Sequence, residues 1–121
     1  MAQQGVSHLM SSTFEKREQA QEAKYAHDRE MDFKVSARRN KLLGLWAAEL
    51  MGMKDADAEA YGKQTVMADF DEPGIVPADE DVFHKVRADL DTAKIDVSDH
   101  DLRRKMDSLI RVAREQLEAE A

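Results

Sequence analysis

The chain has 121 residues, of which 42% are hydrophobic and 36% are charged, and it contains no cysteine. This composition is typical of one helical domain, and the missing cysteines exclude disulfides and thiolate metal sites. The net charge of −7 argues against a nucleic-acid-binding protein, because phosphate binding needs a basic face. No apolar run approaches the roughly 20 residues of a membrane-spanning helix, and the N-terminus lacks a signal-peptide pattern, so we expect a cytoplasmic protein without direct membrane insertion.

The first predicted element is a long helix. Residues 1–12 are polar and show no period, so we expect them to form a disordered tail, in which Met10 is a candidate alternative start. Ser12 and Glu15 have the spacing of a capping box that opens a helix. The sequence that follows is rich in Ala, Glu, Lys and Arg and free of proline, so the helix is predicted to continue to residues 50–53.

The two halves of this helix differ in their apolar pattern. In the second half, wound at about 100° per residue, the large apolar residues share one stripe that must be buried, and Trp46 is predicted at the centre of the core. Phe14 and Tyr25 continue the stripe into the first half, but that half is too polar to be stable as an isolated helix. We therefore expect residues 13–30 to form a mobile arm and residues 31–121 to form a bundle.

Three shorter helices are predicted after the long one. They cover residues 56–70, 80–92 and 99–121, and a loop that holds both prolines is predicted at residues 71–77. Each helix follows a residue suited to N-capping: Asp55, Asp79 and Ser98. Four helices joined by short loops predict an all-α fold, an antiparallel four-helix bundle with a long first helix and a mobile N-terminal arm. Around Trp46, the predicted core contains Leu42, Leu43, Leu50, Phe70, Phe83, Val86, Leu90, Met106, Leu109 and Ile110.

No catalytic centre is predicted from the sequence. It has no cysteine, no serine with a general base at a recognisable spacing and no glycine-rich phosphate loop. Glu80 and His84 are four residues apart, but a divalent metal site usually needs three or four ligands. We therefore expect no enzymatic activity, no metal site and no required cofactor.

Two groups of basic residues have two open interpretations. They are Arg38, Arg39 and Lys41, with Lys34 nearby, and Arg103 and Arg104, followed by Lys105. If the first and fourth helices pack together, these cations can flank one anionic pocket, for example for a nucleotide phosphate. Alternatively they pair with carboxylates of residues 55–101, a segment with four basic and fourteen acidic residues and hence a net charge of −10. We favour this second, intramolecular interpretation.

Several blocks of the sequence resemble one known family. They are residues 14–18, 22–28, 68–74, 80–89 and 102–107, and above all Ala-Arg-Arg-Asn-Lys-Leu-Leu-Gly-Leu-Trp-Ala-Ala-Glu at residues 37–49. Together they are similar to the zeta-type inhibitor subunit of the F-type ATP synthase of alphaproteobacteria. The resemblance covers roughly residues 13–120.

This resemblance implies a regulatory inhibitor of the F-type ATP synthase. In that family the N-terminal arm becomes helical and inserts into a catalytic α/β interface near the γ shaft, which blocks ATP hydrolysis. The implied partners are the α, β and γ subunits, and the protein is expected to be a monomer when free and peripheral to the inner membrane when bound. The implied partner-binding residues are Phe14, Glu15, Lys16, Arg17, Glu18, Gln21, Glu22, Lys24, Tyr25 and Asp28.

The basic residues also allow an alternative function. The chain would be a small nucleotide-sensing helical bundle, with adenine nucleotide as a weak regulatory ligand. The anion site would then consist of Arg38, Arg39, Lys41, Arg103 and Arg104.

Overall fold

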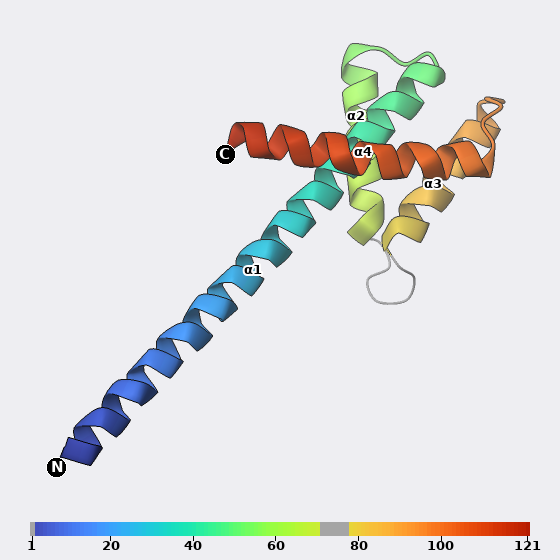
Figure 1. The fold of residues 1–121 in the computed structure, drawn as a ribbon. Coiled ribbons are helices and arrows are strands. Elements are labelled where there is room, and N and C mark those ends of the chain that lie inside the picture. The colour runs from blue at the N-terminus through green and yellow to red at the C-terminus, as the bar shows by residue number, and fades with distance from the viewer. Residues whose placement is uncertain (1, 71–77) are drawn as a thin grey trace. The chain divides into compact units, whose positions relative to one another are not determined.

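The computed structural model describes the backbone of residues 2–70 and 78–121, and the side chains of residues 15–69 and 79–121. The elements are helix α1 (Ala2–Leu50), helix α2 (Asp55–Met67), the short 3-10 helix η1 (Ala68–Phe70), helix α3 (Ala78–Thr92) and helix α4 (Asp99–Glu120) (Figure 1). The described residues contain no strand, and the prediction of an all-α helical bundle is confirmed. The loop predicted at residues 71–77 lies outside the described residues.

The chain divides into two compact units, Met1–Phe33 and Lys34–Ala121, and α1 contributes residues to both. Among the described side chains, those of the buried hydrophobic core all belong to the second unit, beginning with Val35. Helix α1 begins at Ala2, so the helix start predicted at Ser12 is wrong; no proline interrupts the preceding residues. The functional division into tail (1–12), arm (13–30) and bundle (31–121) stays a prediction.

Only one of the three predicted N-caps has that role. The Ser98 hydroxyl accepts a hydrogen bond from the backbone N–H of Asp101 at 3.1 Å and caps α4. Helix α2 already includes Asp55, and Lys54 precedes it without a side-chain cap. Helix α3 begins at Ala78, which places Asp79 in the first turn, where its negative charge complements the helix dipole.

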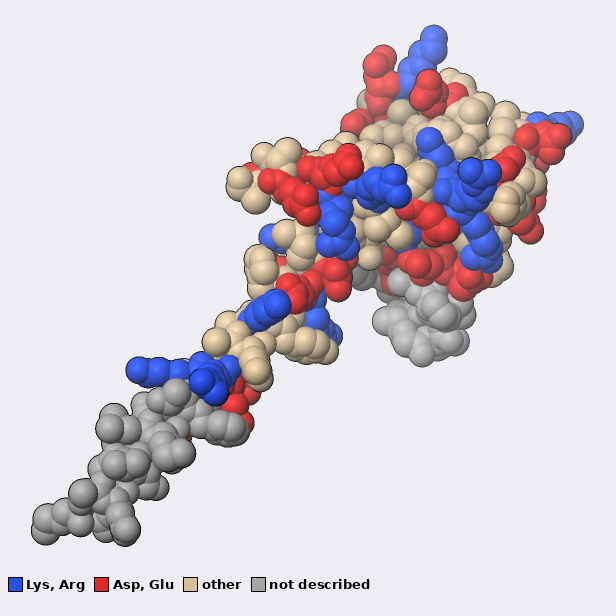
Figure 2. All heavy atoms as spheres, viewed as in Figure 1, with Lys and Arg blue, Asp and Glu red and all other residues tan. Residues whose placement is uncertain are grey.

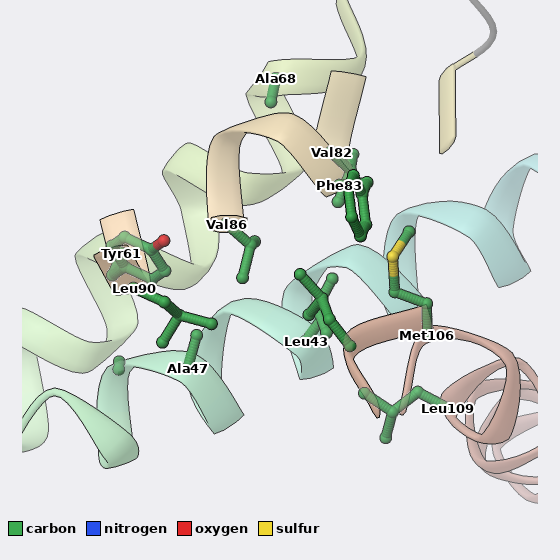
Figure 3. Packing of buried hydrophobic residues seen from close by; sticks show 12 residues of the cluster. Leu43, Ala47, Tyr61, Ala68, Val82, Phe83, Val86, Leu90, Met106 and Leu109 are labelled. Atoms are coloured by element: carbon green, nitrogen blue, oxygen red, sulfur yellow. The ribbon is translucent and has the colours of Figure 1, made fainter. Parts of the chain in front are cut away.

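The core of the second unit joins all of its long helices (Figure 3). Its centre contains fully buried side chains from α1, α3 and α4, and Tyr61 adds a ring from α2. Six of the predicted core residues are confirmed as buried: Leu43, Phe83, Val86, Leu90, Met106 and Leu109. Phe70 was also predicted there, but its side chain lies outside the described residues.

The predicted central position of Trp46 is wrong. Trp46 is only partly buried and packs against the core from its edge, where the Lys105 Nζ lies 5.6 Å from the ring centroid. Leu50 is 40% exposed, and Leu42 and Ile110 are only partly buried. At about 100° per residue, the buried face around Leu43 and Ala47 is centred about 80° away from the predicted stripe. The buried face consists largely of small and polar residues, which a search for large apolar side chains overlooks.

A close crossing of α1 and α2 explains this rotation. A Cβ atom added at Gly44 would lie 2.5 Å from Thr65 Oγ1 and 2.8 Å from the Gly62 Cα. The Thr65 hydroxyl in turn donates to the Tyr61 carbonyl oxygen at 2.9 Å and has no space to move into the helix. Gly44 therefore permits the approach of two backbones, and the face that carries it must point inward.

The substitution Gly44→Ala should destabilise the bundle, although alanine favours helix by about 1 kcal/mol. The overlap with the α2 backbone should cost more, giving a net loss of about 1–3 kcal/mol. The matched control is Gly62→Ala, whose Cβ would meet its nearest atoms at 3.5 Å, an ordinary contact. Urea denaturation should place the midpoint of Gly44→Ala below that of Gly62→Ala, and the reverse order would contradict the close crossing.

Candidate functional site

The arm residues of α1 present an exposed helical surface. Every described side chain from residue 15 to residue 30 is exposed, and Tyr25, at 65%, is the most exposed of the large hydrophobic residues. The guanidinium carbon of Arg29 lies 5.6 Å from the centroid of the Tyr25 ring, one helical turn away. A ring that is held in this way and left open to solvent is suited to binding a partner surface.

The helical register divides the predicted partner-binding residues into one central face and its flanks. At 100° per residue, five positions point within about 40° of their common mean direction around the helix: 14, 18, 21, 25 and 28. We call this set the Tyr25 face; its described members are Glu18, Gln21, Tyr25 and Asp28, and the Phe14 side chain lies outside the described residues. The remaining predicted residues are exposed: Glu15, Arg17, Glu22 and Lys24 lie to either side of the Tyr25 face, and Lys16 lies on the opposite side of the helix.

Four consecutive residues of α1, Arg38 to Lys41, each contact a different element of the second unit. Arg38 donates to both carboxylate oxygens of Glu120 at 2.9 Å and to Gln116 at 2.9 Å, near the end of α4. Lys41 lies 3.7 Å from a carboxylate oxygen of Glu59 on α2. These contacts hold this part of α1 to the other helices of the second unit.

The two central residues of this run are buried. Arg39 is 2% exposed, and its Nη2 donates to the Asp79 carboxylate of α3 at 2.5 Å. Its Nε donates to the Asn40 Oδ1 at 2.6 Å, and the Asn40 amide donates to the Asp69 carboxylate of η1. A buried arginine needs a counter-charge and hydrogen-bond acceptors, and here Asp79 supplies the charge while Asp79 and Asn40 accept hydrogen bonds.

The second basic group is also paired within the bundle. Arg103 donates to both oxygens of the Glu80 carboxylate, at 2.8 and 3.1 Å, and its guanidinium carbon lies 3.9 Å from the Phe83 ring centroid. The hydrogen bond from Arg103 is the main reason why the pKa of Glu80 is lowered. Arg104, the next residue, is exposed.

These positions do not bring the two basic groups into one pocket. Arg38 contacts α4 at Gln116, whereas Arg103 lies near the beginning of the same helix, roughly 20 Å away at 1.5 Å per residue. The ion pairs therefore favour the intramolecular interpretation, and no contact in the described residues supports a common anion pocket. Figure 2 shows basic and acidic side chains interspersed on the visible face of the second unit.

One hollow was not predicted from the sequence. It has a volume of about 390 Å³ and is lined by Met51, Met53, Tyr61, Gln64, Lys85, Asp89, Thr92 and Ala93. Its polar groups already pair with one another: the Tyr61 hydroxyl and the Lys85 ammonium donate to Asp89 at 2.7 and 3.0 Å. Burial, aided by the bond to Asp89, raises the pKa of Tyr61. The hollow thus presents no unpaired charge to a ligand.

The described residues show neither a metal site nor a membrane-spanning helix. They contain no group of three or more His, Cys, Asp or Glu side chains able to hold a metal ion. None of the described helices is both long enough and apolar enough to cross a membrane.

Comparison with known proteins identifies related sequences over most of the chain. A family model described as ATPase inhibitor subunit zeta matches residues 10–116. A protein solved in solution by NMR is 43% identical, with a TM-score of 0.62, over 75% of this chain and 99% of its own. No curated protein matches the chain.

Proposed function

Because this chain belongs to the family of ATPase inhibitor zeta subunits, we propose that it is a non-enzymatic regulator that inhibits ATP hydrolysis by the F-type ATP synthase. The observation that carries the proposal is the family match over residues 10–116, which spans both the arm and the bundle. In this proposal residues 13–30 are the inhibitory segment and the bundle is its anchor.

The arm is suited to docking in a groove of a larger partner. Its Tyr25 face offers one large exposed ring flanked by carboxylates, while its helix buries no described side chain between residues 15 and 30. A helix this polar is stabilised when a partner supplies the apolar groove. We propose that this groove lies at a catalytic α/β interface next to the γ subunit, so that the inserted arm obstructs rotation in the direction of hydrolysis.

In this proposal the bundle keeps α1 fixed when force acts on the inserted arm. The four residues Arg38 to Lys41 connect α1 to α4, α3, η1 and α2. They follow shortly after Phe33, the last residue of the unit that contains the arm. Four contacts to separate elements resist bending of α1 better than one contact would. We further propose that the protein is a cytoplasmic monomer when free and lies at the inner membrane, bound to the α, β and γ subunits, when it inhibits.

The substitution Tyr25→Ala should weaken inhibition by about tenfold or more, since a central aromatic anchor commonly contributes over 1 kcal/mol to binding. The matched control is His27→Ala, also exposed but about 200° around the helix from Tyr25. ATP hydrolysis by the synthase, titrated with each variant, gives the concentration for half inhibition. That concentration should rise for Tyr25→Ala and stay within about twofold for His27→Ala. Equal effects of the two substitutions would argue against docking through the Tyr25 face.

A further inference from the structure

A cluster of carboxylates lies where α1, η1 and α3 meet. It contains Asp69 of η1, which accepts from Asn40 of α1, Asp79 of α3, which accepts from Arg39 of α1, and Asp81 of α3, whose charge acts on Asp69. We call these three acids the acid cluster. Arg39 is the cation that pairs with it, through Asp79, so the cluster and Arg39 together carry an excess of negative charge when all three acids are ionised.

Two oxygens of this cluster have no hydrogen-bond donor among the described residues. They are Asp69 Oδ1 and Asp81 Oδ2, and both atoms are buried from solvent. The second oxygen of Asp69 accepts from the Asn40 amide, so this carboxylate is held in place on one side only. A buried acceptor without a donor is costly, and a proton on the Asp69 carboxyl group removes the buried negative charge at that place.

We propose that the Asp69 carboxyl group binds a proton in the folded protein, and that loss of this proton lowers the stability of the bundle. The charged neighbours are consistent with such a site. Burial is the main cause that raises the pKa of Asp69, to about 6, and the charges of Asp79 and Asp81 raise it further, while Arg39 and Asn40 oppose the shift. No titratable group of α2, the other helix packed on η1, contributes to this shift.

The sign of the effect on stability follows from this shift. The pKa of Asp69 is 3.8 in the absence of the fold and about 6 in it, so between these values the folded state binds more protons than the unfolded state. Stability from this site is therefore complete below about pH 4 and is lost as the pH rises through 6. Two pKa units correspond to about a 100-fold change in the folding equilibrium, and screening by solvent reduces this to between about 10-fold and 100-fold. Glu80 and Glu120 act oppositely, because their pKa values are lowered by arginine partners.

The test is a carboxyl-carbon NMR titration of the full chain, assigned with the variants Asp69→Asn and Asp81→Asn. We expect the Asp69 signal of the wild-type protein to titrate near pH 6, to be absent in Asp69→Asn, and to titrate at a lower pH in Asp81→Asn, which removes a neighbouring negative charge. The exposed control Asp96→Asn should leave that signal unchanged. If all aspartates titrate near their ordinary values, the proposal is wrong, even if a variant fails to fold.

Urea denaturation adds a second readout. The wild-type protein should lose stability between pH 4 and pH 7 relative to Asp69→Asn, whose amide keeps the acceptor for Asn40 and cannot ionise. Parallel pH profiles of the two proteins would contradict a proton held at this site. Neither measurement depends on inhibition of the ATP synthase, so the inference stands or falls independently of the proposed function.

Discussion

A chain without residues 1–28 should keep its folded bundle and lose its inhibition of ATP hydrolysis. None of the described side chains among the deleted residues, 15–28, is buried, and the compact second unit begins at Lys34. Removal of the arm therefore uncovers little apolar surface, and the urea midpoint and circular dichroism per helical residue should change little. In the proposed mechanism the same deletion removes the whole docking surface.

A shorter deletion provides the control for this experiment. A chain without residues 1–12 retains the entire Tyr25 face and should inhibit as the intact chain does. Both shortened chains are compared in the hydrolysis assay at equal concentrations, after their folding has been checked. Full inhibition by the chain without residues 1–28 would assign the inhibitory surface to the bundle instead.

The substitution Arg39→Met should be among the most destabilising in the chain, at about 3 kcal/mol. Methionine fills much of the same space but leaves Asp79 without its ion-pair partner and Asp69 without a nearby cation, and it removes the donor that orients Asn40. Because Asp79 is 62% exposed, solvent partly compensates its charge, which places the expected value at the lower end of the range for buried pairs.

The neighbouring arginine is the matched control. Arg38→Met removes an ion pair with Glu120 that lies at the surface, and pairs of this kind contribute little to stability. Urea denaturation at pH 7 should therefore separate the two variants clearly. Equal destabilisation would show that the burial of Arg39 has no special energetic role.

The sequence predicted those features correctly that depend on residues close together in the chain. The Ser98 cap depends on residues three positions apart, and the helices after residue 54 follow from hydrophobic spacing within single turns. The confirmed core residues of α3 and α4 lie on the two most regular amphipathic patterns of the chain. Such patterns report burial well because one face of each helix carries nearly all the large apolar residues.

The buried face of α1 could not be predicted in the same way. It is determined by Gly44, which permits contact with α2, and by Arg39 and Asn40, whose partners lie 40 and 29 residues away in the sequence. Charged residues are rarely buried, so the sequence favoured pairing of Arg39 with an acidic residue but did not predict that its side chain is buried. The partners of Arg38 and Arg103 depend on tertiary packing and were likewise not evident from the sequence.

The most direct test of the proposed inhibition uses the isolated F-type ATP synthase of the same organism. Its rate of ATP hydrolysis is measured as the intact chain is added. If the chain is an inhibitor, the rate of ATP hydrolysis should fall as more chain is added and reach a constant low level once every synthase is occupied. A rate that stays unchanged at a large excess of folded chain would contradict the proposed inhibitory function.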